Sequence, residues 1–163
     1  MKKLRIFLPI FLIIITIAWV TPAFAEWSIQ QVNPGTGIVK GNYAAFGMTF
    51  TSDGSAMAAT DIIARIANAT LKSNVQGKTL YKIGVSPGSG GVAPNAAFDI
   101  TVTNDWDMII YAGTSISHSA ESWPDIFVSM AVYPPVLNEF NLAIGDIGDS
   151  GDQVTLYFYF WVD

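Results

Sequence analysis

The chain has 163 residues, 13 acidic against 8 basic side chains, a formal net charge of -5 and no cysteine. The lack of cysteine excludes disulfides, thiol nucleophiles and cysteine-ligated metals. Phosphate recognition needs clustered lysine and arginine, so no nucleic-acid partner is expected.

The first 25 residues follow the order of a secretory signal peptide. A basic opening at residues 2–5 precedes an apolar run over 6–20, and Ala23-Phe24-Ala25 has small residues at the two positions that signal peptidase inspects. The alternative is a membrane anchor, but such an anchor needs about 20 apolar residues and this run is shorter. We therefore expect an N-terminal signal helix that is cleaved after Ala25, and a single β-rich domain over 26–163. The general secretory route would leave it in the periplasm or at the cell exterior, with membrane contact only before cleavage.

Charge is unevenly distributed along the remaining chain. Residues 26–98 hold five bases and three acids, which gives +2, whereas residues 99–163 hold ten acids and no base, which gives -10. The simplest interpretation is a soluble acidic surface. The alternative is a homo-oligomer in which the two oppositely charged segments meet head to tail.

Alternating apolar and polar residues predict half-buried strands throughout the mature chain. In the segment 79–85 this alternation places Thr79, Tyr81, Ile83 and Val85 on one face. Turn residues separate the segments, which together predict a mainly β, antiparallel sandwich or jelly-roll-like domain. The predicted strands are 27–32, 43–51, 79–85, 97–103, 108–112, 126–133, 140–144 and 154–162.

One segment departs from the β pattern. Ile62, Ile63 and Ile66 recur at helical spacing, and Thr60 or Asp61 is a suitable N-terminal cap. The spacing predicts one short helix over 60–71.

The last predicted strand has large residues on both faces. Val154, Leu156, Phe158, Phe160 and Val162 form the aliphatic and phenylalanine face. Such a strand is typical of the centre of a sheet or of a position covered on both sides. The other face carries Thr155, Tyr157, Tyr159 and Trp161, and the last three are candidate interface residues if a second subunit, rather than a second sheet, covers them.

Three aspartates recur at three-residue intervals among glycines in the segment 145–152. Carboxylate oxygens on a flexible loop suit calcium, so Asp146, Asp149 and Asp152 are candidate ligands. No other cofactor is expected. The simpler interpretation is a polar hairpin turn between the two flanking strands.

No arrangement of residues predicts catalysis. His118 is the only histidine, and it lies among serines in a polar stretch without a nucleophile motif. We therefore expect that the protein is not an enzyme. Two alternatives to a structural or interaction protein remain. One is a carbohydrate-binding surface domain with Trp106, Tyr111 and Trp123 as stacking residues, and the other is a small outer-membrane β-barrel, suggested by the aromatic last strand.

The segment 90–105, Gly-Gly-Val-Ala-Pro-Asn-Ala-Ala-Phe-Asp-Ile-Thr-Val-Thr-Asn-Asp, combines a glycine-rich turn with a strand that ends in aspartate. Together with Lys82-Ile83-Gly84-Val85 and the closing strand from Gly151, it resembles small β-rich structural proteins of tailed phages and prophages over about residues 78–163. The resemblance implies a virion-associated or otherwise structural protein without catalytic residues. Trp106-Asp107 departs from the small or glycine residues usual after that strand, and phage particle proteins do not normally carry a secretory signal.

We predict that the mature protein begins at Glu26-Trp27, because the small residues before Glu26 suit signal peptidase. N-terminal sequencing of exported protein checks this prediction. A start at any other residue would contradict the cleavage site.

Overall fold

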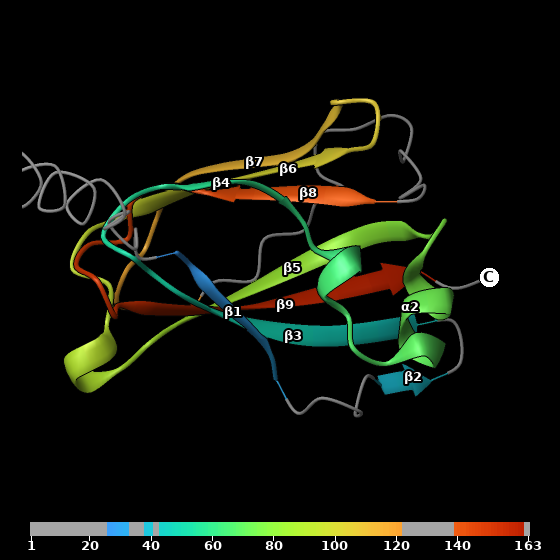
Figure 1. The fold of residues 1–163 in the computed structure, drawn as a ribbon, viewed down its shortest axis with the longest axis horizontal. Coiled ribbons are helices and arrows are strands. Elements are labelled where there is room, and N and C mark those ends of the chain that lie inside the picture. The colour runs from blue at the N-terminus through green and yellow to red at the C-terminus, as the bar shows by residue number, and fades with distance from the viewer. Residues whose placement is uncertain (1–25, 33–37, 41–42, 122–138, 162–163) are drawn as a thin grey trace, which may run out of the picture.

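The computed structural model describes residues 26–32, 38–40, 43–121 and 139–161. They form two antiparallel sheets that face each other, which confirms a mainly β sandwich (Figure 1). The first sheet has the order β1-β3-β9-β5, with β2 also pairing with β3: β1 Ser28–Gln31, β2 Ile38–Lys40, β3 Tyr43–Thr51, β5 Thr79–Pro87 and β9 Gln153–Trp161. The second has the order β4-β8-β6-β7: β4 Met57–Asp61, β6 Phe98–Asn104, β7 Ile109–Ile116 and β8 Phe140–Ile144. The predicted signal helix and the strand predicted at 126–133 lie outside the described residues.

The strand β9 organises the first sheet and supplies its largest buried side chains. It pairs along its whole length with β3 on one side and from Val154 onward with β5 on the other. This central position agrees with the prediction from its two large faces. Its inner residues Val154, Leu156, Phe158 and Phe160 are completely buried.

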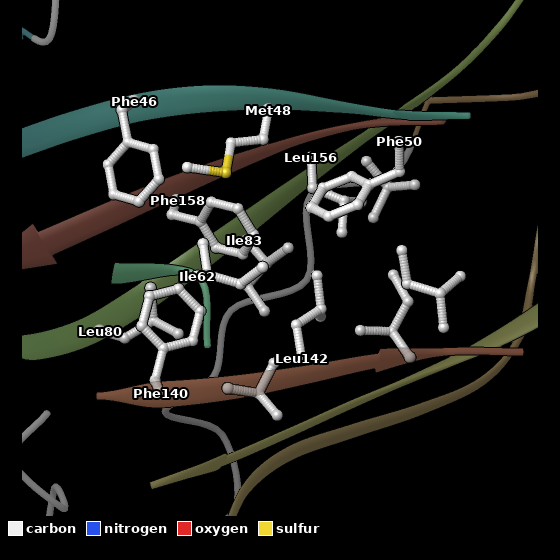
Figure 2. Packing of buried hydrophobic residues seen from close by; sticks show 14 of the residues in the cluster. Phe46, Met48, Phe50, Ile62, Leu80, Ile83, Phe140, Leu142, Leu156 and Phe158 are labelled. Carbon is white, nitrogen blue, oxygen red and sulfur yellow. The ribbon is translucent and has the colours of Figure 1, made fainter. Parts of the chain in front are cut away.

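Phenylalanine rings join the two sheets at the middle of the core. Figure 2 shows side chains of β3, β5 and β9 pointing toward those of β8. The Phe140 ring of β8 lies 5.3 Å from the Phe158 ring and 5.9 Å from the Phe160 ring, measured between centroids. These distances are typical of aromatic pairs that add to the stability gained by burial. The inward residues of the second sheet, Ile100, Val102, Leu142 and Ile144, complete the core.

The helical segment differs from the predicted helix over 60–71. Strand β4 continues to Asp61, a 3-10 turn spans Ile63–Arg65, and the helix α2 covers Ala69–Val75. The helix begins where the Asn68 carboxamide oxygen accepts a hydrogen bond from the Leu71 N–H at 3.0 Å. Asp61 instead accepts from the Ile63 N–H and forms a tight turn. The isoleucine spacing therefore reflects a short 3-10 turn that places Ile62, Ile63 and Ile66 in the core.

A bulge in β5 overturns the prediction that Tyr81 shares a face with Ile83 and Val85. The register shifts between Leu80 and Lys82, so that Leu80 faces Phe160 while Lys82 faces Tyr159. A bulge sets two residues of one strand against one of its partner. As a result Leu80 and Ile83 are buried, and Tyr81 lies on the outer face of the sheet.

The segment 145–152 is not the hairpin turn that its aspartates and glycines suggest. It leaves β8 in one sheet and enters β9 in the other, so it joins the two layers. Ile147 anchors it in the core with no exposed surface, and the Ile147 carbonyl accepts a hydrogen bond from the Asn95 N–H at 3.2 Å.

We predict that Phe158→Ala lowers the free energy of unfolding by about 3–5 kcal/mol, because it removes a buried ring between the two sheets. Urea denaturation of the mature protein measures the change. The matched control is Thr155→Ala on the outer face of the same strand, which removes a hydroxyl hydrogen bond to Thr49 and should cost about 1 kcal/mol. Equal losses for the two variants would contradict the assignment of the inner face.

Candidate functional site

Five aromatic side chains gather on the outer face of the first sheet: Tyr43, Tyr81, Tyr157, Tyr159 and Trp161, referred to below as the aromatic face. Four of the rings, those of Tyr43, Tyr81, Tyr159 and Trp161, form tilted or edge-to-face pairs. The centroid of Trp161 lies 4.8 Å from that of Tyr43 and 5.9 Å from that of Tyr81, with interplanar angles of 78° and 83°. The three predicted interface residues are therefore brought together with Tyr43 and Tyr81, which alternation alone did not identify.

Strand register explains why these rings meet. Trp161 at the end of β9 is paired with Tyr43 at the start of β3, so their side chains stand directly opposite each other. On the other side of β9, the bulge in β5 adds Tyr81 beside Lys82, which faces Tyr159. A regular β5 would have turned Tyr81 into the core and left the face with one ring fewer.

Tyr157 occupies the same face through a glycine neighbour. It pairs with Gly47 in β3, and a Cβ built on Gly47 would lie 2.9 Å from the Tyr157 ring. A glycine at position 47 therefore lets the Tyr157 ring lie flat against the sheet.

The aromatic face is partly open to solvent although the opposite face of β9 is fully buried. Tyr43 and Trp161 remain 42% and 41% exposed. Burial, followed by the nearby Tyr157, raises the pKa of Tyr159 above 10.0. The Tyr159 side chain is therefore uncharged at neutral pH. The charged residue opposite Tyr159 is Lys82 of β5.

A second exposed apolar group lies on the turn between β6 and β7, residues 105–109, referred to below as the finger. Its large side chains are among the most exposed of the described residues: Trp106 is 66%, Met108 is 52% and Ile109 is 55% exposed. The strand predicted at 108–112 is found in β7 except for Met108, and the finger overlaps it at Met108 and Ile109.

A buried asparagine holds the finger in shape. Asn104 is only 1% exposed, and its side-chain oxygen accepts hydrogen bonds from the N–H groups of Trp106 and Met108, both at 3.0 Å. Its own N–H donates to the Met108 carbonyl at 3.1 Å, and Asp107 takes a positive φ of 59°. The turn is thus fixed by its own hydrogen bonds while its large side chains face outward.

The residues predicted to stack on sugar occupy different environments. Trp106 stands on the finger, whereas Tyr111 is half buried against the core, lies over Gly113, and has a pKa raised by burial. Trp123 lies outside the described residues. The two described members thus differ in burial, because Trp106 is strongly exposed and Tyr111 packs partly against the core.

Each of the three aspartates of the segment 145–152 accepts a hydrogen bond, two from within the loop and one from Asn95. Asp146 accepts from the Gly148 N–H, Asp152 from the Asp149 N–H, both at 2.9 Å, and Asp149 from the Asn95 carboxamide at 3.2 Å. Over the ranges that the structure describes, no three His, Asp or Glu side chains are grouped closely enough to hold a metal ion.

His118, the only histidine, is exposed after the end of β7. The neighbouring Ser117 hydroxyl accepts from the N–H groups of Ser119 and Ala120, so it caps a local turn. In the part of the chain that the structure describes, no helix is long and apolar enough to span a membrane.

Comparison with known proteins adds no neighbour: no family model, curated protein or solved structure matches this chain.

We predict that millimolar calcium leaves the melting temperature of the mature protein unchanged relative to a chelator, because backbone and amide groups already engage the loop carboxylates. A ligand that binds only the folded state would raise that temperature by mass action. A calcium-dependent rise that disappears in Asp149→Asn would instead establish the metal site.

Proposed function

We propose that this chain is an exported, non-enzymatic structural or interaction protein that associates with itself through the aromatic face. The carrying observation is the asymmetry of β9. Its inner face is completely buried, while the tyrosine and tryptophan rings of its outer face remain partly exposed to solvent. Tyrosine and tryptophan are enriched at protein interfaces, where an apolar ring and a polar tip are both used.

Energetics support an assembly role for this face. Apolar burial contributes about 25 cal/mol per Å², so covering two or three large rings would stabilise a complex by several kcal/mol. Exposed ion pairs contribute about 0–1 kcal/mol each. The rings therefore provide most of the attraction, and the surrounding charges select the orientation.

Carbohydrate binding fits the aromatic face less well. Stacking on a sugar favours rings that present parallel flat surfaces, whereas Tyr43, Tyr81, Tyr159 and Trp161 meet at angles of 53°, 61°, 78° and 83°. Edge-to-face packing uses the ring faces for contacts with one another. A rigid patch of this kind is better suited to a protein partner.

The resemblance to phage structural proteins agrees with this proposal. A β-sandwich without catalytic residues and with a self-associating face would act as a virion-like accessory module reused outside the cell. The signal peptide would bring it to the periplasm or the cell surface.

We predict that Trp161→Ser lowers the native mass of the exported protein to that of one subunit while the subunit stays folded, because the ring is partly exposed rather than buried in the core. Sedimentation velocity measures the mass and circular dichroism the fold.

The matched control is Val92→Ser, an exposed apolar residue at the other end of the sandwich, which should leave the mass unchanged. A wild-type protein that stays monomeric at high concentration and low salt contradicts the proposal. So does a Trp161→Ser variant that loses thermal stability by a few kcal/mol at unchanged mass, because that outcome assigns the ring to packing within one subunit.

A further inference from the structure

The aromatic face and the finger lie at the same end of the sandwich, on opposite sheets. Asn104, which directly precedes the finger, is paired with Phe140, and the Phe140 ring lies 5.9 Å from that of Phe160, the neighbour of Trp161. Figure 1 shows the β6–β7 turn, the end of β9 and α2 at one end of the molecule. All the strongly exposed large apolar residues of the described ranges, Val92 excepted, therefore gather at this end.

The charges beside these two surfaces are opposite. Asp105 and Asp107 belong to the finger, and Glu139 precedes Phe140 beside it. On the first sheet, Lys82 stands opposite Tyr159, and Lys78 directly precedes Thr79, the partner of Trp161. An acidic apolar protrusion and a basic aromatic surface are complementary in both hydrophobicity and charge.

The far end of the sandwich is acidic. Asp53, Asp99 and Glu121 lie there with the three aspartates of the segment 145–152, and Glu121 accepts a hydrogen bond from Ser86 near the end of β5. The bases whose side chains the structure describes, Arg65, Lys72, Lys78 and Lys82, all lie toward the opposite end, in or beside the helical segment and the start of β5. The far end therefore carries acids, whereas the end with the finger and the aromatic face carries these bases together with Asp61, Asp105, Asp107 and Glu139.

We infer that the partner of the aromatic face is the finger of a second copy of this chain, in a closed two-fold dimer. This inference rests on the proposed self-association and specifies its geometry. Because the finger and the aromatic face share one end, two copies that meet at that end can dock both fingers at once. Such an interface is self-complementary and closes after two subunits.

Charge also disfavours the open alternative. In a head-to-tail chain the acidic end of one copy would meet the aromatic end of the next, and the apolar finger would remain exposed. Burial of rings and aliphatic side chains contributes more than ion pairs on an exposed surface. In the closed dimer both acidic ends point away from the interface, and repulsion between them opposes further growth.

Disulfide trapping tests this geometry, since the chain has no native cysteine to interfere. The variants Lys82→Cys and Asp107→Cys, purified separately and mixed under mild oxidation, should give a linked product of two subunits on a non-reducing gel. Each variant alone should not. The double variant K82C/D107C should give a two-subunit band without a ladder, because a closed dimer has no free finger or face.

Three outcomes of this experiment overturn the inference. A ladder from the double variant would establish an open chain. A linked product from mixed Lys82→Cys and Asp149→Cys would place the acidic end on the aromatic face, as head-to-tail packing requires. If mixed Lys82→Cys and Asp107→Cys give no linked product although the protein sediments as an oligomer, self-association stands but the finger is not the partner of the aromatic face.

A second variant tests the energetic role of the finger. Trp106→Ala should weaken dimerisation by about 10- to 100-fold, the range expected when a large apolar anchor is truncated. Its exposure predicts that the subunit stays folded, which circular dichroism checks. Val92→Ala is the matched control and should leave the dimerisation constant unchanged. A dimer that Trp106→Ala does not weaken rejects the finger, while a monomeric wild type rejects self-association itself.

Discussion

The fold depends on hydrogen bonding of β9 along both of its edges, because this places a strand with two large faces at the centre of a sheet. One face can enter the core, and it does so completely through Val154, Leu156, Phe158 and Phe160. The second sheet covers this inner face and cannot also cover the outer one. The opposite rings must be covered by neighbours in their own sheet or by another molecule, and the structure covers them only in part.

Much of the architecture could be predicted from local sequence because the responsible interactions are local. Strands β3 and β8 occur over the predicted residues, since alternation and flanking turns specify both their faces and their ends. The helix lies later in the chain than its predicted range because buried isoleucines at helical spacing also suit a 3-10 turn, and the start of the helix depends on the Asn68 cap. The sequence of the segment 145–152 favours a hairpin because its glycines and aspartates suit a turn without indicating which sheet the next strand joins.

The candidate site likewise contains residues that local sequence predicts and residues that depend on strand pairing. Tyr157, Tyr159 and Trp161 could be predicted because they alternate along one strand. Tyr43 could not be added to them without the register of β3 against β9, and Tyr81 required a bulge that alternation does not reveal. The finger falls between the predicted strands 97–103 and 108–112, but alternation does not reveal that Asn104 is buried and fixes its shape.

The indole N–H resonances of the mature protein test the central claim most directly, because Trp27, Trp106 and Trp161 report on three separate places. Heteronuclear NMR spectra recorded across a dilution series follow each resonance. The account predicts that the Trp106 and Trp161 signals shift together with concentration, while the signal of Trp27, whose indole N–H donates to the Ser55 carbonyl at 2.9 Å, stays constant. Signals of Trp106 and Trp161 that do not move at any concentration would contradict it.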